Sequence, residues 1–150
     1  MVLDSAEADS PKIVLLDKIE TQSRLSMTPP AGSLSPPHCS SVGKVLLAYA
    51  PLRVLERIAR EPLERFTENT VTDPSALVVE LESIRQNGYA LDREELEVGL
   101  TCVAAPIFNH RDEVAGAISL SGPTVRMNPR LPEIIAGVQG CALEISRNLR

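Results

Sequence analysis

With 150 residues, of which 43% are hydrophobic and 23% are charged, the chain is long enough to form one globular domain with a buried core. Aromatic residues make up only 3% and tryptophan is absent, so this core must consist mainly of aliphatic side chains. The formal net charge is −5 and no Lys/Arg-rich run occurs, which argues against direct binding of nucleic-acid phosphates by this chain.

The three cysteines, Cys39, Cys102 and Cys141, are far apart and form no C-x-x-C pair. This spacing predicts free thiols in a reducing cytoplasm and no metal site. All apolar runs are shorter than the roughly 20 residues that a membrane-spanning helix needs, and the acidic start lacks a signal-peptide pattern. We therefore expect a cytoplasmic protein with no membrane contact and no cofactor.

The first third of the chain predicts strands followed by a loop. Residues 1–11 are expected to be a flexible segment, and residues 12–19 (KIVLLDKI) are typical of a strand. Residues 23–28 are a candidate second strand. Four prolines within residues 29–37 predict a loop.

Three helices are predicted next. Residues 40–50 have apolar side chains close to helical spacing, and Pro51 ends this run and opens a second helix. Asp73 and Pro74 form a cap and first turn for the third helix, which Gly88 ends. The side chains expected to point inward are Leu52, Leu55 and Ile58 in the second helix and Leu77, Leu81 and Ile84 in the third.

The remaining residues predict a short strand at 89–92 and two longer strands at 101–108 and 114–121, which a polar hairpin connection joins. A last helix is expected to begin at Asn128-Pro129 and to continue to the C-terminus. Strands joined by a hairpin, with helices around them, predict an α+β domain whose antiparallel sheet is flanked by helices.

No catalytic set of nucleophile, base and orienting acid is present. His38, which follows two prolines, is expected to be a structural hydrogen-bond donor rather than a ligand, and His110 a solvated loop residue. Lys44 lacks the glycine spacing of a phosphate-binding loop and is interpreted as a helix-surface charge. A solvated acidic run is expected at Glu94, Glu95 and Glu97.

Alternation along two strands gathers small side chains on one face of the sheet. On the strand from Val114, the residues that share one face are Val114, Gly116, Ile118 and Leu120, and those that share the other are Ala115, Ala117, Ser119 and Ser121. The neighbouring strand adds Cys102, Ala104 and Pro106. Such a face suits a pocket for a small carboxylate or hydroxyl compound, but the pattern by itself favours close approach of a helix. Nucleophilic Cys102 would need an adjacent His or cation, which the sequence does not place there.

Five segments of the chain, in this order, resemble motifs of the isocitrate lyase regulator (IclR) family. The segments are His38–Ala48 (HCSSVGKVLLA), Arg65–Thr70 (RFTENT), Ile84–Glu95 (IRQNGYALDREE), Gly99–Ile107 (GLTCVAAPI) and Ala117–Pro123 (AISLSGP). The resemblance implies a GAF-like fold. It also implies that residues 12–150 form an effector-binding domain that regulates an upstream winged helix-turn-helix domain.

This resemblance implies a pocket whose residues are Ser41, Val42, Asp92, Cys102, Ser119 and Ser121. Backbone N–H groups near Ser41 would hold an anion, the serine hydroxyls would donate to it, and Asp92 would accept a ligand hydroxyl or be protonated. Leu25 and Met27 are expected to wall one side. The family often has Gly-Ala where this chain has Ser41-Val42, and the larger side chains would reshape the anion end.

The sequence therefore predicts a sensor of a small organic acid, not an enzyme, that self-associates to a dimer or tetramer. No winged helix precedes residue 12, so we expect contact with DNA only through a domain absent from this chain. Either the chain is a piece of a longer regulator, or the DNA-binding part has been lost. The alternatives are a Cys-dependent enzyme that uses Cys102 and Cys39 on a GAF-like fold, and an oligomerisation module whose pocket Ser41 and Val42 fill.

Overall fold

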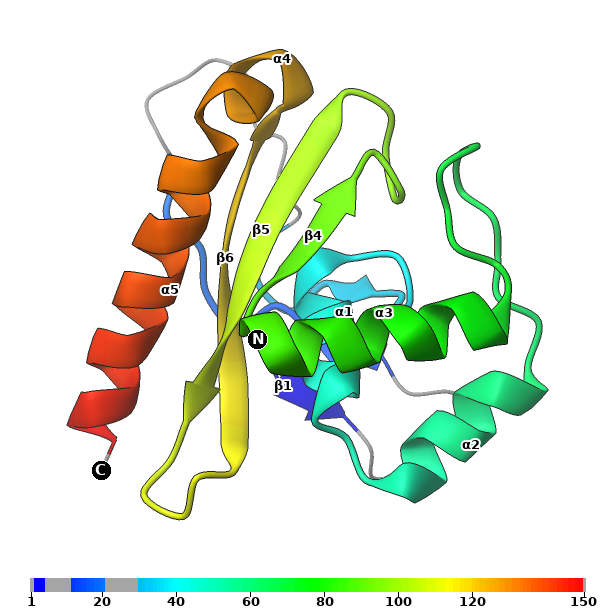
Figure 1. The fold of residues 1–150 in the computed structure, drawn as a ribbon, viewed down its shortest axis with the longest axis horizontal. Coiled ribbons are helices and arrows are strands. Elements are labelled where there is room, and N and C mark those ends of the chain that lie inside the picture. The colour runs from blue at the N-terminus through cyan, green and yellow to red at the C-terminus, as the bar shows by residue number, and fades with distance from the viewer. Residues whose placement is uncertain (1, 5–11, 21–29, 150) are drawn as a thin grey trace.

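A computed structural model of the chain describes residues 2–4, 12–20 and 30–149 (Figure 1). Helix α5 covers one face of a central antiparallel sheet, and α1 and α3 lie on the other side, which confirms the predicted α+β class. In chain order the elements are β1 (Val2–Asp4), β2 (Lys12–Val14), β3 (Leu34–Ser35), α1 (Ser41–Ala48), α2 (Leu52–Arg60), α3 (Pro74–Asn87), β4 (Ala90–Arg93), β5 (Leu100–Phe108), β6 (Val114–Pro123), α4 (Thr124–Met127), the 3-10 helix η1 (Asn128–Arg130) and α5 (Leu131–Asn148).

The strands of the described residues form two antiparallel sheets, with the orders β1–β2–β3 and β4–β5–β6. Strand β1 pairs with β2 and lies within residues 1–11, for which the sequence predicts no regular structure. Strand β2 ends at Val14 and is shorter than the predicted strand at residues 12–19. The candidate strand at residues 23–28 lies outside the described residues.

Two apolar clusters fill the spaces on either side of the β4–β5–β6 sheet. Towards α5, Val103 and Ala105 pack against Val138 and Ala142. Towards α1 and α3, the sheet contributes only alanines to the cluster of buried residues, and these pack with the apolar side chains of α1. These alanines are Ala90, Ala104 and Ala117. The interpretation that small residues allow a helix to approach the sheet is therefore confirmed for Ala104 and Ala117, the two that it included.

Helix α3 has both of its predicted ends. The Asp73 carboxylate accepts hydrogen bonds from the backbone N–H groups of Ser75 and Ala76 at 3.2 Å each. Gly88 ends the helix with a φ of 72°, a left-handed conformation that glycine adopts without steric cost. The predicted inward side chains of this helix, Leu77, Leu81 and Ile84, are buried.

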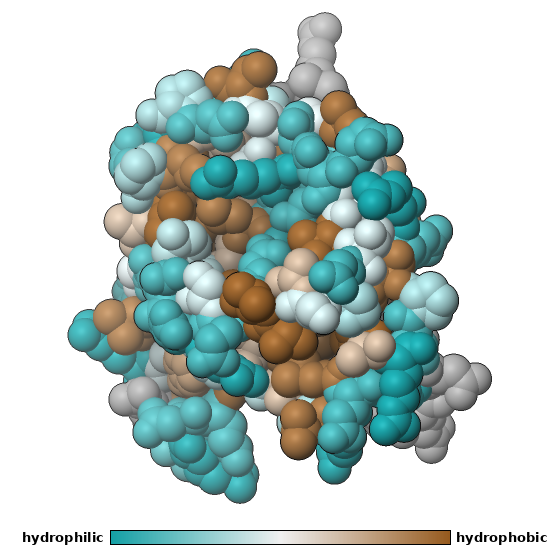
Figure 2. Space-filling view, turned by 45° about the vertical axis from the view of Figure 1, so that its right-hand side comes forward, coloured by the Kyte–Doolittle hydropathy of each residue, from teal (hydrophilic) through white to brown (hydrophobic). Residues whose placement is uncertain are grey.

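Helices α2 and α5 differ from their predictions. Leu52 is 70% exposed because α2 buries Val54 and Ile58, which are four residues apart and share a face that Leu52 lies outside. Figure 2 brings the side of α2 and α3 forward and shows apolar patches there between hydrophilic side chains. The predicted start of the last helix at Asn128 is instead η1, and α5 begins at Leu131 with a second proline in its first turn. None of the helices in the described residues is long and apolar enough to cross a membrane.

Strand β6 contains a β-bulge near its start. The pairing register shifts between Ile107 and Phe108 of β5, which leaves Ala115 as an extra residue in β6. The insertion turns Val114 to the side of α1, where it packs against the core cluster. The prediction that Val114 shares a face with Ile118 is therefore wrong, since strict alternation holds only beyond the bulge.

The start of α1 is fixed against the proline-rich loop. The Ser40 hydroxyl accepts a hydrogen bond from the Gly43 N–H at 3.2 Å and donates one to the Pro36 carbonyl at 3.0 Å. A Cβ atom added at Gly43 would lie 2.3 Å from the Pro37 carbonyl oxygen and 2.6 Å from its Cα. The close packing of Pro37 therefore requires glycine at this position.

We expect Gly43→Ala to lower the free energy of unfolding by about 1–3 kcal/mol, because the added methyl group overpacks against a backbone that cannot retreat freely. Gly137→Ala in α5 is the matched control, since nothing lies within 4 Å of a Cβ there. That change should raise stability by up to about 1 kcal/mol through helix propensity. Urea unfolding of the two variants measures both effects, and equal effects would contradict the proposed close packing.

Candidate functional site

The pairing of β4, β5 and β6 places three of the predicted site residues in one row across the sheet. Cys102 pairs with Asp92 on one side and with Ser121 on the other, so the three side chains share the face towards α1. The Cys102 thiol has hydrogen bonds to both neighbours. Ser119 lies in the next row, opposite Ala104. Asp92 and Cys102 are buried, whereas the two serines are exposed.

Ser41 and Val42 lie at the start of α1, which packs on this same face of the sheet. Both side chains are buried, and the Ser41 hydroxyl has no hydrogen-bond partner in the described part of the chain. The charges of Asp92 and Glu95 act on the Cys39 thiol, two residues before Ser41. The start of α1 therefore lies near the Asp92 end of the row. The two predicted wall residues, Leu25 and Met27, lie outside the described residues.

A buried ion-paired lysine lies beside this row. The Lys44 side chain is fully buried, and its Nζ lies 2.5 Å from Oε1 of Glu80 on α3 and 2.7 Å from Oε1 of Glu95 after β4. The backbone N–H of Glu95 donates to Oδ1 of Asp92 at 2.8 Å. A continuous chain of polar contacts thus runs from α3 through Lys44 and Glu95 to Asp92.

The interpretations of Lys44 as a helix-surface charge and of Glu95 as a solvated residue are therefore wrong. Every residue of α1 is buried, and a helix buried on all sides leaves no solvated face for a charge. The sequence carried a signal for this outcome, because the segment VGKVLLA has Lys44 as its only charged residue. Its partners, however, lie 36 and 51 residues further along the chain.

The loop that carries Glu95 is held by the segment that contains Thr67 and Thr70, whose role the sequence did not reveal. The Thr67 hydroxyl donates to the Glu94 carbonyl and the Thr70 hydroxyl to the Glu95 carbonyl, each at 2.6 Å. Glu94 has a φ of 58°, and its carboxylate accepts from the Gly99 N–H at 2.7 Å. These contacts fix the loop and so fix the carboxylate that faces Lys44.

Burial dominates the electrostatics of the site. It raises the pKa of Asp92, although the Glu95 N–H and the Lys44 charge act in the opposite direction. It also raises the pKa of Glu95 against the attraction of Lys44. The pKa of the Cys102 thiol is raised to about 12, chiefly by burial. The pKa of Cys39 is likewise raised to about 12. Since a nucleophilic cysteine needs a lowered pKa, the site does not favour thiol catalysis.

The two histidines lie where the sequence predicts. His38 is 5% exposed and its Nε2 donates to the Glu64 carbonyl at 2.8 Å, which confirms the predicted hydrogen-bond donor. His110 is exposed in the β5–β6 hairpin, as predicted. Among the described residues, no group of three His, Cys, Asp or Glu side chains could hold a metal ion.

Lys44→Met is expected to lower the free energy of unfolding at pH 7 by about 3 kcal/mol or more, because it leaves a buried carboxylate without its counter-charge. Adding Glu95→Gln should restore part of that loss. Urea unfolding at pH 7 measures the stability of the single and the double variant. Lys18→Met is the control, on a lysine that does not contact Glu80 or Glu95. A loss of stability no larger than that of Lys18→Met would contradict the buried ion pairs.

Asp92→Asn should change how stability depends on pH. Since the pKa of Asp92 is higher in the folded chain than the value of about 3.9 in unfolded chains, its contribution to stability is fully present below that pH. The contribution is lost as pH rises through the folded-state pKa. The unfolding free energy of the wild type minus that of Asp92→Asn should therefore fall between pH 4 and pH 7. A difference that rises over this range would mean that the pKa is lowered by folding.

Known proteins match almost the whole chain. The family described as bacterial transcriptional regulator IclR, C-terminal, matches residues 4–147. The HTH-type transcriptional regulator BhcR of Paracoccus denitrificans is 46% identical over 136 residues, which cover 89% of this chain and 49% of BhcR. The HTH-type transcriptional regulator KdgR of Escherichia coli is 35% identical over 143 residues, which cover 94% of this chain and 54% of KdgR. The chain thus spans about half the length of these relatives.

Solved structures agree with this match. A transcriptional regulator from Rhodococcus sp. RHA1 superposes with a TM-score of 0.86 at 26% identity, over 92% of this chain and 57% of that one. A second structure is a double mutant of the inducer-binding domain of the Acinetobacter transcription factor PobR, in complex with 3-hydroxybenzoic acid. It superposes with a TM-score of 0.71 at 29% identity, over 77% of this chain and 70% of that one. The chain therefore belongs to the IclR family of bacterial transcriptional regulators and corresponds to the C-terminal domain of its members.

Proposed function

We propose that this chain is the effector-sensing domain of a transcriptional regulator and that its effector is a small organic acid. The observation that carries the proposal is the Ser41 hydroxyl in the first turn of α1, which is buried and has no hydrogen-bond partner among the described residues. The start of α1 lies near the buried Asp92–Cys102 pair. Buried hydroxyl groups without a partner are rare in folded proteins. A ligand between α1 and the sheet would supply the missing partner.

The first turn of α1 is suited to hold the acid group. The hydroxyl and carbonyl oxygens of Ser40 accept hydrogen bonds from the N–H groups of Gly43 and Lys44, which leaves those of Ser41 and Val42 for a ligand. These N–H groups and the helix dipole favour an anion at this position. The bulk of Ser41 and Val42, where the family often has Gly-Ala, restricts the acid end to a small carboxylate.

The row across the sheet is suited to hold the rest of the molecule. The exposed hydroxyls of Ser119 and Ser121 donate to carboxylate or carbonyl oxygens of the ligand. Asp92 has a raised pKa, so it either binds a proton and donates, or accepts from a hydroxyl group of the ligand. This preference favours α-hydroxy acids and hydrated keto acids. The PobR domain complex with 3-hydroxybenzoic acid, which combines a carboxylate and a hydroxyl group, supports this class of ligand.

Regulation would follow from different affinities of the ligand for two arrangements of protomers. We propose that the intact regulator is cytoplasmic, that it self-associates to a dimer or tetramer partly through this domain, and that it contacts DNA through a domain outside this chain. The relatives BhcR and KdgR are transcriptional regulators, which supports a sensor without enzymatic activity. Domain movement on ligand binding would then reposition the DNA-binding parts.

A thermal-shift screen against short hydroxy, keto and aromatic carboxylic acids tests the proposal. An acid at a hundred times its Kd should stabilise the domain by about 2.7 kcal/mol. Ser119→Ala and Ser121→Ala should each weaken binding by about 1 kcal/mol or more, roughly fivefold, through loss of a hydrogen bond to a charged group.

Ser75→Ala, on the exposed first turn of α3, is the control and should leave the shift unchanged. Isothermal titration of the best acid gives the affinities of all four proteins. Equal affinity of the wild type, Ser119→Ala and Ser121→Ala for the acid would contradict the proposed pocket.

A further inference from the structure

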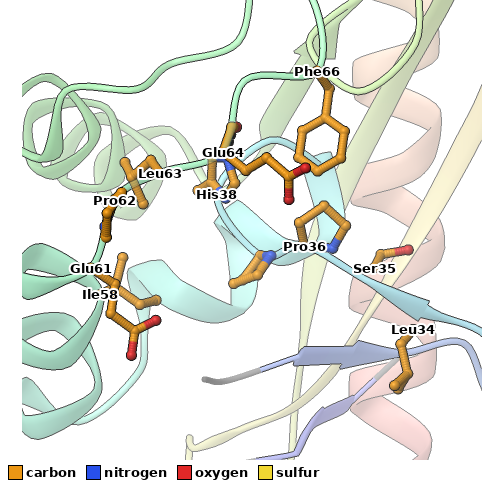
Figure 3. Close-up of a pocket in the computed structure, with 11 residues that line it drawn as sticks. Leu34, Ser35, Pro36, His38, Ile58, Glu61, Pro62, Leu63, Glu64 and Phe66 are labelled. Atoms are coloured by element: carbon orange, nitrogen blue, oxygen red, sulfur yellow. Dashed lines mark hydrogen bonds between the residues drawn. The ribbon is translucent and has the colours of Figure 1, made fainter. Parts of the chain in front are cut away.

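A separate cavity lies behind the loop that leads into α1. It has a volume of about 340 Å³, within the range of small-molecule sites, and none of its lining residues belongs to the proposed acid site. Its walls come from the proline-rich loop, the end of α2 and the segment after α2 (Figure 3). Its lining side chains include Pro36, Pro37, His38, Leu63, Glu64 and Phe66.

The charge of this cavity is opposite to that of an acid site. Among the described residues that line it, two are glutamates, Glu61 and Glu64, and none is a lysine or an arginine. In Figure 3 the Glu64 carboxylate and the Phe66 ring both point towards Pro36, while the Glu61 carboxylate lies at the far side. A carboxylate ligand would be repelled by the Glu64 carboxylate, and a cation would be attracted to that carboxylate and to the face of the Phe66 ring.

His38 adds a hydrogen-bond acceptor to the same wall. Its Nε2 lies 2.8 Å from the Glu64 carbonyl oxygen, and a carbonyl can only accept, so Nε2 carries the proton. In the neutral ring Nδ1 is then an acceptor, and no partner for it lies among the described residues. His38 is 5% exposed and its ring centroid lies 6.1 Å from that of Phe66, so the acceptor is held in place next to an aromatic surface.

We propose that this cavity binds a small primary amine with an apolar or aromatic body. The ammonium group would lie against the Glu64 carboxylate and the Phe66 ring and would donate a hydrogen bond to Nδ1 of His38. The apolar body would pack on Pro36, Pro37 and Leu63. This site takes the opposite charge from the proposed acid site and does not depend on it.

Isothermal titration of the chain with 2-phenylethylamine, 2-phenylethanol and phenylacetate tests the proposal, because the three probes share a phenyl body and differ in charge. The amine should bind at least fivefold more tightly than the alcohol, and phenylacetate should not bind in competition with the amine. The imidazole ¹⁵N resonance of His38 Nδ1 should shift on addition of the amine, which reports contact at this ring directly.

Two variants locate the binding. Glu64→Gln should weaken the amine at least fivefold and leave the alcohol unchanged, and Phe66→Ala should weaken both. Glu68→Gln, an exposed glutamate in the same segment but outside the cavity, should change neither. Amine affinity that is the same in Glu64→Gln and Glu68→Gln would overturn the proposal. The proposal would also be overturned if the amine did not bind and Phe66→Ala changed the oligomeric state. The cavity would then be an interface between copies of the chain.

Discussion

The buried ammonium group of Lys44 is the constraint on which much of the structure depends. A charge of this kind is costly to remove from water, and it is tolerated only where carboxylates reach it at short distance. Lys44 meets Glu80 at 2.5 Å and Glu95 at 2.7 Å, so α1, α3 and the loop after β4 must all be in place together. Because the N–H of Glu95 in turn holds Asp92, the same requirement positions the polar end of the proposed acid site.

The two faces of the central sheet differ because successive side chains of a strand point to opposite faces. Beyond the bulge at Ala115, alternate residues of β6 face α5 or α1, and those that face α1 are small. Ala117 packs beneath α1 as part of the core, whereas Ser119 and Ser121 lie further along the strand and remain exposed. A single strand thus supports a helix at one end and presents hydroxyl groups at the other.

Much of the fold and part of the candidate site could be predicted from the sequence, because both rest on local patterns. The Asp73 cap, the Gly88 stop and the shared face of Ser119 and Ser121 follow from residue spacing that neighbouring residues determine. The burial of Lys44 and the direct alignment of Asp92, Cys102 and Ser121 depend instead on contacts between distant segments and on strand register. Neither the ion pairs nor the bulge that reverses Val114 has a signature that a single stretch of sequence displays.

The position of Lys44 in the chain determines when α1 can be buried during synthesis. The lysine leaves the ribosome before Glu80 and Glu95, which follow it by 36 and 51 residues. Until Glu80 emerges, burying α1 would enclose a cation without a counter-charge, so water remains the better surroundings for that helix. The domain therefore cannot close its α1-side core step by step from the N-terminus. A nascent chain that ends before Glu80 would keep the apolar side chains of α1 in water, and exposed apolar surface of this kind makes a chain prone to aggregate.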